Sequence, residues 1–283
     1  LLGTKQTIFS RYTPIIVLVT IGGYGLSTFQ KKQIEAEQKS IRRIIHTLFP
    51  KAKLSLGLES VSSSLISKSN LFGTNNVQSI SFGRVSFNHS QQVVFHDLLV
   101  GSSHTNWFTQ TSIGGFFYVI KMMFKGVFSK RAENVVGNFR GLFAEAKMDK
   151  KINGTVIVLP DHLEKHLDYL AKNIQTLKNT KTNKLVKLED IEFEHYFAVY
   201  SSDEITARYV LTPAMMRRMT ELKKRYNRDI MFSFNKDHFF FAVSMPEGFL
   251  TLGAKSFTSE EVLQDLYANF VTVKETLQDL KLQ

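Results

Sequence analysis

The stretch "EHYFAVYSSDEITARYVLTPAMMRRM", residues 194–219, changes within a few residues from a strand-like pattern to a helix-like one. From Phe193 to Val199, alternate residues face one side, which predicts a strand. Residues 205–211 alternate again and predict a second strand, after a turn at 201–203. Thr212 can cap a helix, and Pro213 suits its first position. The stretch therefore predicts two strands followed by a helix.

Helical spacing continues beyond this stretch and predicts which side of the helix is buried. Its apolar face comprises Met215, Met219, Leu222 and Tyr226. The basic residues left largely outside are Arg217, Arg218, Lys223, Lys224 and Arg225. The next segment, "IMFSFNKDHFFFAV", predicts a hairpin with a four-residue loop at 235–238. Together these elements predict an α+β fold, with packed helices on a largely antiparallel sheet.

Further strands and helices are expected on both sides of this unit. Short apolar runs between polar turns predict strands across residues 54–105, in "SLGLESVSSSLIS", "VQSISFGRVSFNH" and "QQVVFHDLLVG", with a bulge near Gly83. Residues 139–160 predict two more strands, with a turn at Asn153-Gly154. Helices are expected after the N-cap residue Asp161 and over residues 259–282.

Composition limits the classes of function. With 43% apolar and 22% charged residues, the 283-residue chain is of ordinary globular composition. It has no cysteine, which excludes disulfides, thiolate metal sites and cysteine nucleophiles. Its net charge of +11 favours a polyanionic neighbour, either nucleic acid or an anionic membrane surface.

Residues 12–29 predict a transmembrane helix. They carry no charge and would form about 27 Å of helix, close to the roughly 30 Å of a hydrocarbon core. A buried soluble helix would usually show a polar stripe, and a cleavable signal peptide would show a small-residue cleavage site. Neither feature is visible here. Basic residues accumulate after the span, at Lys31, Lys32, Lys39, Arg42 and Arg43, which predicts that the part that follows is cytoplasmic.

The chain is therefore expected to have three parts. Residues 1–32 form the membrane anchor, 33–50 a helical stalk, and 51–283 a cytoplasmic α+β domain. The stalk face comprises Ile34, Ile41, Ile45 and Leu48, and Pro50 ends it. Within the anchor, Gly23 and Ser27 have the small-xxx-small spacing of a helix–helix contact.

The apolar and basic segment 113–131 predicts a helix with three alternative roles. As an interfacial or re-entrant helix it would contact the membrane, with lysines at the headgroups. As a core helix it would instead expose those lysines to solvent, and a second full span is a third alternative. The residues expected to contact membrane are Phe116, Phe117, Ile120, Lys121, Phe124 and Lys125.

Several separated blocks resemble an uncharacterised bacterial membrane-protein family, domain of unknown function 3137. They are "LVKLEDIEFEHYFAVYSSDEITARYVLTPAMMRRM" at 185–219, "FRGLF" at 139–143, "TVIVLPD" at 155–161 and "SFNKDHFFFAV" at 233–243. The resemblance covers roughly residues 40–283. It implies membrane helices ahead of a cytoplasmic domain and a LemA-type membrane protein as a partner. It carries no catalytic residue across.

No motif predicts an enzyme, a cofactor or a metal centre. His162 and His166 have the spacing of metal ligands, but the glutamate of a zincin motif and a third ligand are missing. There is no phosphate-binding loop, since the glycine-rich stretch 20–26 lies inside the predicted span. The basic residues of the helix after Pro213 could contact phosphates, yet no nucleic-acid-binding motif accompanies them, so no nucleic-acid partner is predicted.

These features predict a non-enzymatic scaffold or adaptor of the bacterial inner membrane that self-associates or joins a membrane partner and contacts membrane lipid. The alternative is a sensor domain at the cytoplasmic face, with a pocket for a small molecule or nucleotide that sequence alone does not reveal.

Overall fold

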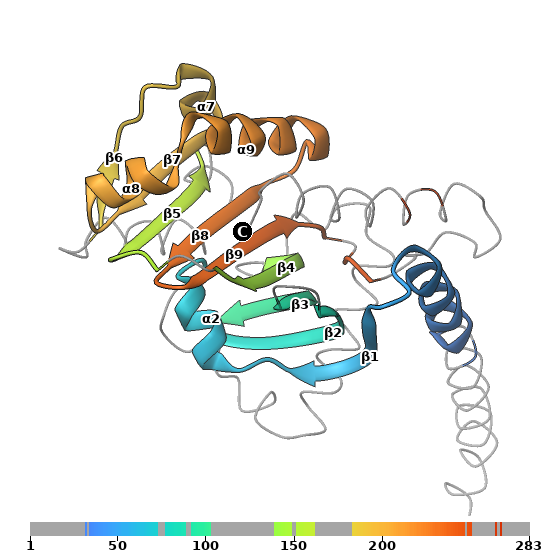
Figure 1. The fold of residues 1–283 in the computed structure, drawn as a ribbon. Helices are drawn as coiled ribbons and strands as arrows, with labels where there is room; N and C mark the ends of the chain where they lie inside the picture. Colours follow the sequence, from blue (N-terminus) through green and yellow to red (C-terminus); the bar gives the residue numbers. More distant parts are fainter. Residues whose placement is uncertain are drawn as a thin grey trace, which may run out of the picture. The chain divides into compact units, whose positions relative to one another are not determined.

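The computed structural model describes the chain in several stretches, drawn in colour in Figure 1. They comprise residues 32, 34–72, 77–88, 92–102, 139–148, 151–161, 183–246, 248–250, 264 and 267. The sheet and its covering helices belong to the second of two compact units, residues 45–283.

Within the described stretches, one nine-stranded sheet organises this unit, and all neighbouring strands pair antiparallel. In order across the sheet the strands are β1 (Lys53–Ser60), β2 (Val77–Asn88), β3 (Gln92–Ser102), β4 (Phe139–Lys147), β9 (His238–Ser244), β8 (Ile230–Asn235), β5 (Thr155–Pro160), β7 (Phe197–Ser201) and β6 (Lys184–Val186). The α+β fold with a large antiparallel sheet is thus confirmed. Strands β4 and β9 are distant in sequence but lie side by side in its middle (Figure 1).

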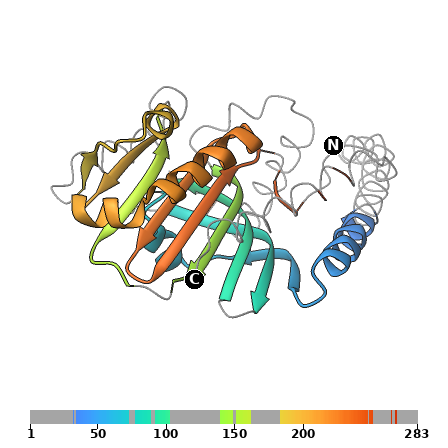
Figure 2. The same ribbon diagram turned by 45° about the horizontal axis from the view of Figure 1, so that its top comes forward.

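Alternating side chains build a separate core on each face of the sheet. On one face, Ile66 of helix α2 (Ser63–Ser69) packs in a cluster that includes Met231 and Phe240. On the other face, the ring of Phe232 contacts Phe197, which contacts Phe193 of helix α7 (Ile191–Tyr196). Helices α8 (Glu204–Val210) and α9 (Pro213–Tyr226) lie on that second face too (Figure 2).

Short helices replace three of the predicted strand segments. The strand prediction was wrong for 193–196, which belong to α7, and for 205–210, which form α8. Hydrogen bonds at each N-cap decide the local structure. Asp190 accepts one from the backbone N–H of Phe193 at 3.0 Å, and Asp203 accepts one from Thr206 at 2.8 Å. The second half of "SLGLESVSSSLIS" is likewise helix α2 and not strand.

Helix α9 begins as predicted, but its buried face is rotated slightly. Thr212 caps it by accepting a hydrogen bond from the N–H of Met215, and Pro213 occupies the first position. Met216 is buried where Met215 was expected. Lys223 was expected to lie outside. Instead its Nζ donates to the carbonyl of Arg228 and pairs with Asp229 at 3.2 Å.

Two turns in the sheet test further predictions. The hairpin between β8 and β9 has a two-residue loop and not the predicted four, because Asn235 pairs with His238. Lys236 takes the left-handed conformation that this tight loop needs, with φ 56°. The predicted bulge near Gly83 is confirmed, since the register of β2 against β3 shifts between Ser81 and Arg84.

A buried carboxylate, Asp97 of β3, connects three parts of the sheet. It forms a bidentate ion pair with Arg140 of β4, at 2.5 and 3.0 Å. It also accepts backbone hydrogen bonds from Phe249 and Leu250, each at 3.0 Å. The segment that follows β9 is thereby fixed to the middle of the sheet.

Next to this ion pair, Gly141 of β4 allows an unusually close backbone approach. Its φ is +153°, and an added Cβ would lie 2.1 Å from the carbonyl oxygen of Val243 on β9. Only glycine fits at such a separation, so the pairing of β4 with β9 depends on it.

Several predicted helices lie partly or wholly outside the described residues. Residues 34–48 are helical, and this helix ends before Pro50. The predicted span 12–29, the helix 113–131 and the helix after Asp161 lie outside. Of the predicted terminal helix, Gln264 and Tyr267 are described and are helical. No helix in the described stretches is both long and apolar enough to span a membrane.

Candidate functional site

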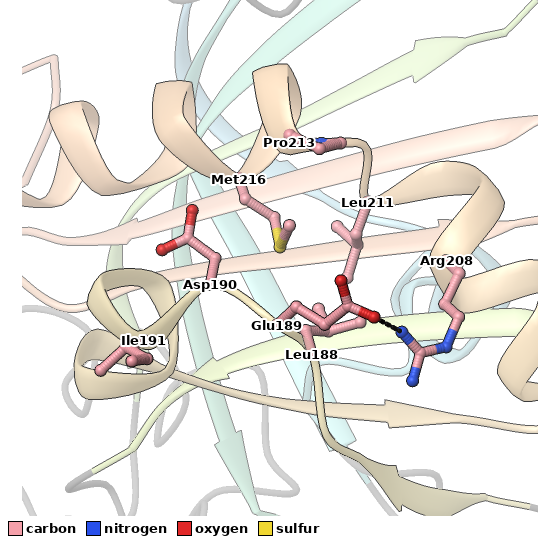
Figure 3. Close-up of a pocket in the computed structure, with 8 residues that line it drawn as sticks. All are labelled: Leu188, Glu189, Asp190, Ile191, Arg208, Leu211, Pro213 and Met216. Carbon is pink, nitrogen blue, oxygen red and sulfur yellow. Dashed lines mark ion pairs between the residues drawn. The ribbon is translucent and has the colours of Figure 1, made fainter.

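An open pocket of about 520 Å³ lies between α7, α8, α9 and the loop that precedes α7 (Figure 3). Leu188, Leu211 and Met216 are buried and supply apolar surface to it. The other lining residues are Glu189, Asp190, Ile191, Arg208 and Pro213. The pocket thus combines apolar surface with a charged rim.

Local hydrogen bonds hold the loop at 187–190 that forms one wall. The N–H of Leu188 donates to the carboxylate of Glu194 at 2.7 Å. Arg208 of α8 donates to the carbonyl of Lys187 at 3.3 Å. Together with the Asp190 cap, these contacts tie the loop to both α7 and α8. The pocket wall is therefore held in place in the absence of a bound molecule.

Part of the charge at the rim is paired within the domain. Arg208 pairs with Glu204 at 2.9 Å and with Glu189 at 3.6 Å, the second pair being the dashed contact in Figure 3. All three side chains are largely exposed, so these pairs contribute little stability. The lining residues include no serine, cysteine, histidine or lysine.

Large apolar side chains are exposed on α7 and α8, two of the helices that line the pocket. Ile191 on its rim is 85% exposed, and Ile205 and Tyr209 of α8 are 79% and 60% exposed. Ile205 and Tyr209 are one helical turn apart and share the outer side of α8, next to the row of Glu204 and Arg208. We call the pocket residues together with Ile205 and Tyr209 the groove face. Exposed apolar groups gathered at a groove are typical of interaction surfaces.

The groove face is bordered by opposite charges. Residues 188–208 hold six acids and one arginine, namely Glu189, Asp190, Glu192, Glu194, Asp203, Glu204 and Arg208. Residues 212–228 reverse this, with Arg217, Arg218, Lys223, Lys224, Arg225 and Arg228 against Glu221. We call these segments the acidic half and the basic half. The acidic half stands out in a chain whose net charge is +11.

Comparison with known proteins places these elements in a family. The sequence model of the family described as "Protein of unknown function (DUF3137)" matches residues 137–282, more than half of the chain. The chain belongs to this family. The groove face lies wholly inside the part that matches DUF3137, as do strands β4 to β9.

Other comparisons add little to the DUF3137 assignment. Comparison with curated protein sequences finds no significant match. A solved structure similar to this one is that of the mycobacterial trehalose monomycolate transport factor A, TtfA, with a TM-score of 0.41 and 9% sequence identity. The alignment covers 86% of this chain and 95% of TtfA. Similarity at this level does not establish a shared fold or function.

A second polar cluster surrounds His96 of β3, a residue outside the part that matches DUF3137. The residue is 7% exposed, and neither ring nitrogen has a hydrogen-bond partner among the described residues. It pairs across the sheet with Arg84 of β2, and its ring centroid is 6.2 Å from that of Phe143. Burial, and secondarily the charge of Arg84, lowers the pKa of His96 from 6.5 to about 4.

On β4, Glu145 is shifted in the opposite sense. Burial raises its pKa above 4.5, although His238, Lys68 and Arg84 act against the shift. A neutral buried histidine and an acid that resists ionisation are features seen at functional sites. Neither side chain lines the pocket described above. The cluster therefore bears on stability first.

The lowered pKa of His96 predicts that the domain loses stability in mild acid. The unfolded state binds a proton with a pKa near 6.5, whereas the folded state resists it until about 4. The stabilisation that depends on a neutral His96 is therefore fully present above pH 6.5. It is lost as the pH falls toward 4, and the free energy of unfolding decreases by about 3 kcal/mol in total. The measurement is urea unfolding of wild type and His96→Leu from pH 7.5 to 4.5. The difference between the two proteins should change by this amount, because Glu145 acts in both.

The difference between the two proteins isolates the histidine from other titrating groups. Leucine has a similar volume and leaves no buried nitrogen unpaired, so His96→Leu should be at least as stable as wild type at pH 7.5. A difference that stays constant with pH would show that His96 binds its proton in the folded state with the same pKa as in the unfolded state, contrary to its burial.

The residues that the sequence predicts as functional all lie outside the part of the chain that the structure describes. The predicted membrane contacts at 116, 117, 120, 121, 124 and 125, and the helix contact at 23 and 27, lie outside the described residues, as do His162 and His166. Among described residues, no group of three or more His, Asp or Glu side chains could hold a metal ion.

Sequence reasoning missed the groove face because it treated residues 205–211 as a strand. On a strand, Ile205 and Tyr209 belong to an apolar face that packs on the core, whereas on α8 they point outward. The signal that could have found it was the capping pattern, since Asp203 stands three residues before Thr206 and Asp190 three residues before Phe193.

Proposed function

We propose that this DUF3137 member is a membrane-anchored, non-enzymatic scaffold or adaptor that binds a protein partner through the groove face. The anchor is the uncharged stretch 12–29 in the bacterial inner membrane, and the basic residues after it favour a cytoplasmic domain. A LemA-type membrane protein is one partner that the family resemblance implies. Contact of residues 113–131 with lipid is part of the same proposal.

The observation that carries the proposal is the exposure of Ile191, Ile205 and Tyr209 beside a pocket with buried apolar residues. Large apolar groups contribute most to association when they pass from water into a partner's pocket. Exposing three such groups to water costs free energy, and a partner that buries them removes this cost. The charged rim would then set the orientation of the partner.

Replacing two of these groups by aspartate should dissociate the complex that forms through the groove face. In the full chain extracted with mild detergent, Ile191→Asp with Ile205→Asp should shift the main species toward the mass of a single chain. Each of the two substitutions should weaken binding about tenfold or more, because it removes an apolar anchor that the partner buries. Both positions lie in the first turn of a helix, where an acid is favourable, so the fold should persist. Mass photometry or light scattering measures the mass.

A matched control comes from β1. Leu58 is 51% exposed and lies on a different part of the sheet, so Leu58→Asp should leave the particle mass unchanged. If the double variant keeps the wild-type mass, the groove face is not the docking surface. If it instead abolishes stabilisation by a small molecule, the sensor alternative gains support, since ligands that bind only the folded state raise its stability.

A further inference from the structure

We propose that the partner at the groove face is a second copy of this chain, related by a two-fold axis that sets each acidic half against the other copy's basic half. This inference rests on the proposed function and names its partner. It follows from the way charge is divided between two neighbouring segments of one surface.

The two halves mirror each other in charge. Six acids and one base in residues 188–208 precede one acid and six bases in residues 212–228. A surface built in this way matches an inverted copy of itself. A two-fold axis makes each contact twice, because residue i of one copy meets residue j of the other and the reverse.

The structure places both halves around one groove. Lys224 of α9 forms an ion pair with Glu192 of α7, and α7 and α9 both line the pocket, through Ile191, Pro213 and Met216. The halves therefore belong to one continuous surface of the domain. That is the condition for a two-fold contact, whereas halves on opposite sides would build a chain of copies.

Charges remain available on both halves after the internal pairs are counted. Glu189 is 93% exposed, and its contact with Arg208 is 3.6 Å long. Arg208 makes a closer contact, at 2.9 Å, with Glu204. On α9, Arg217 is exposed and points outward by helical spacing. Within the part of the chain that the structure describes, it has no ion-pair partner. A second copy supplies the missing opposite charge to both.

Apolar contacts would supply the affinity between the two copies, and the charges would determine how the copies are aligned. Ile191, at the start of α7 in the acidic half, is 85% exposed on the pocket rim and would enter the apolar groove of the other copy. A parallel arrangement would set acid against acid and base against base, which costs several kcal/mol. The charge pattern therefore selects the inverted arrangement over the parallel one.

The test exchanges the charges on one half at a time in the full chain. The acidic-half variant carries Glu189→Lys and Glu192→Lys, and the basic-half variant carries Arg217→Glu and Arg218→Glu. Each protein is produced with two different affinity tags in one cell, extracted in mild detergent and purified through both tags in turn. Wild type should co-purify with itself, and each variant should do so about tenfold less, since its contacts now repel.

Mixing the two variants should restore co-purification to the wild-type level. In the mixed pair, each altered half again faces an opposite charge, whereas neither variant fits itself. High salt should weaken both the wild-type and the mixed pair. Melting temperatures of the variants, measured alongside, should stay within a few degrees of wild type because these residues are exposed or partly exposed.

Three results would overturn the inference. Variants that self-associate as well as wild type would place the contact elsewhere. A mixture that fails to associate while wild type does would exclude the pairing of acidic with basic halves. Wild type that does not co-purify with itself would exclude a second copy. In that last case the variant with Ile191→Asp and Ile205→Asp could still dissociate a complex with another protein, and the proposed function would stand.

Discussion

Asp97→Ala is expected to lower the free energy of unfolding by about 3–5 kcal/mol. The substitution leaves the guanidinium of Arg140, which is only 19% exposed, without its partner. It also leaves the N–H groups of Phe249 and Leu250 without an acceptor. Urea unfolding followed by circular dichroism measures the loss, and the unfolding midpoint should fall while the slope stays constant.

Two further variants isolate the cause. Glu204→Ala removes an exposed ion pair with Arg208 and should cost no more than about 0.5 kcal/mol. Adding Arg140→Met to Asp97→Ala removes the uncompensated charge and should recover part of the loss. If Asp97→Ala alone costs less than about 1 kcal/mol, the sheet does not depend on this carboxylate.

Gly141→Ala is expected to destabilise the domain by about 3 kcal/mol or more, enough to prevent folding if the wild type is only marginally stable. Its methyl group would lie 2.1 Å from the carbonyl oxygen of Val243 and 2.6 Å from the backbone nitrogen of Met245. Both are backbone atoms, so β4 and β9 would have to separate. The yield of folded protein and its melting temperature measure the effect.

Gly57 provides the matched control for this substitution. It has a comparable φ of +137°, but an added Cβ would meet nothing within 4 Å. Gly57→Ala therefore carries only the strain of the backbone conformation, about 1–3 kcal/mol. Equal losses for the two variants would show that conformation, and not the approach of β4 to β9, determines the effect at Gly141.

Elements with a strong repeating pattern could be predicted from the sequence, and short ones could not. Helix α9 has 14 residues, a capping threonine and a proline at its first position, so three signals agree. Helices α7 and α8 have six and seven residues, fewer than two turns. Over so short a length, apolar residues at alternate positions also predict a strand, as Ile205, Ala207 and Tyr209 do, although α8 buries only Ala207 of the three.

The capping residues could have indicated helix α8, but the pocket of the groove face joins residues that meet only in the folded chain. Its buried apolar residues, Leu188, Leu211 and Met216, come from a loop, a helix end and the first turn of another helix. No periodicity joins them. The exposure of Ile191 and Ile205 is likewise a result of packing, since an isoleucine in isolation predicts burial. The charge reversal near residue 210, in contrast, is visible in the sequence itself.

The position of β4 has a consequence for how the sheet ends. The DUF3137 match begins at residue 137, two residues before β4, so strands β1 to β3 precede it. A sheet made from the matched residues alone would stop at β4 and leave one side of that strand unpaired, as a template for other chains. Here the three preceding strands cover β4 and move the free edge, among described residues, to β1. The pairing of β1 is interrupted between Leu56 and Glu59, and Gly57 has a positive φ. Such irregular edges resist further strand addition, so the extension protects the sheet against aggregation through its edge.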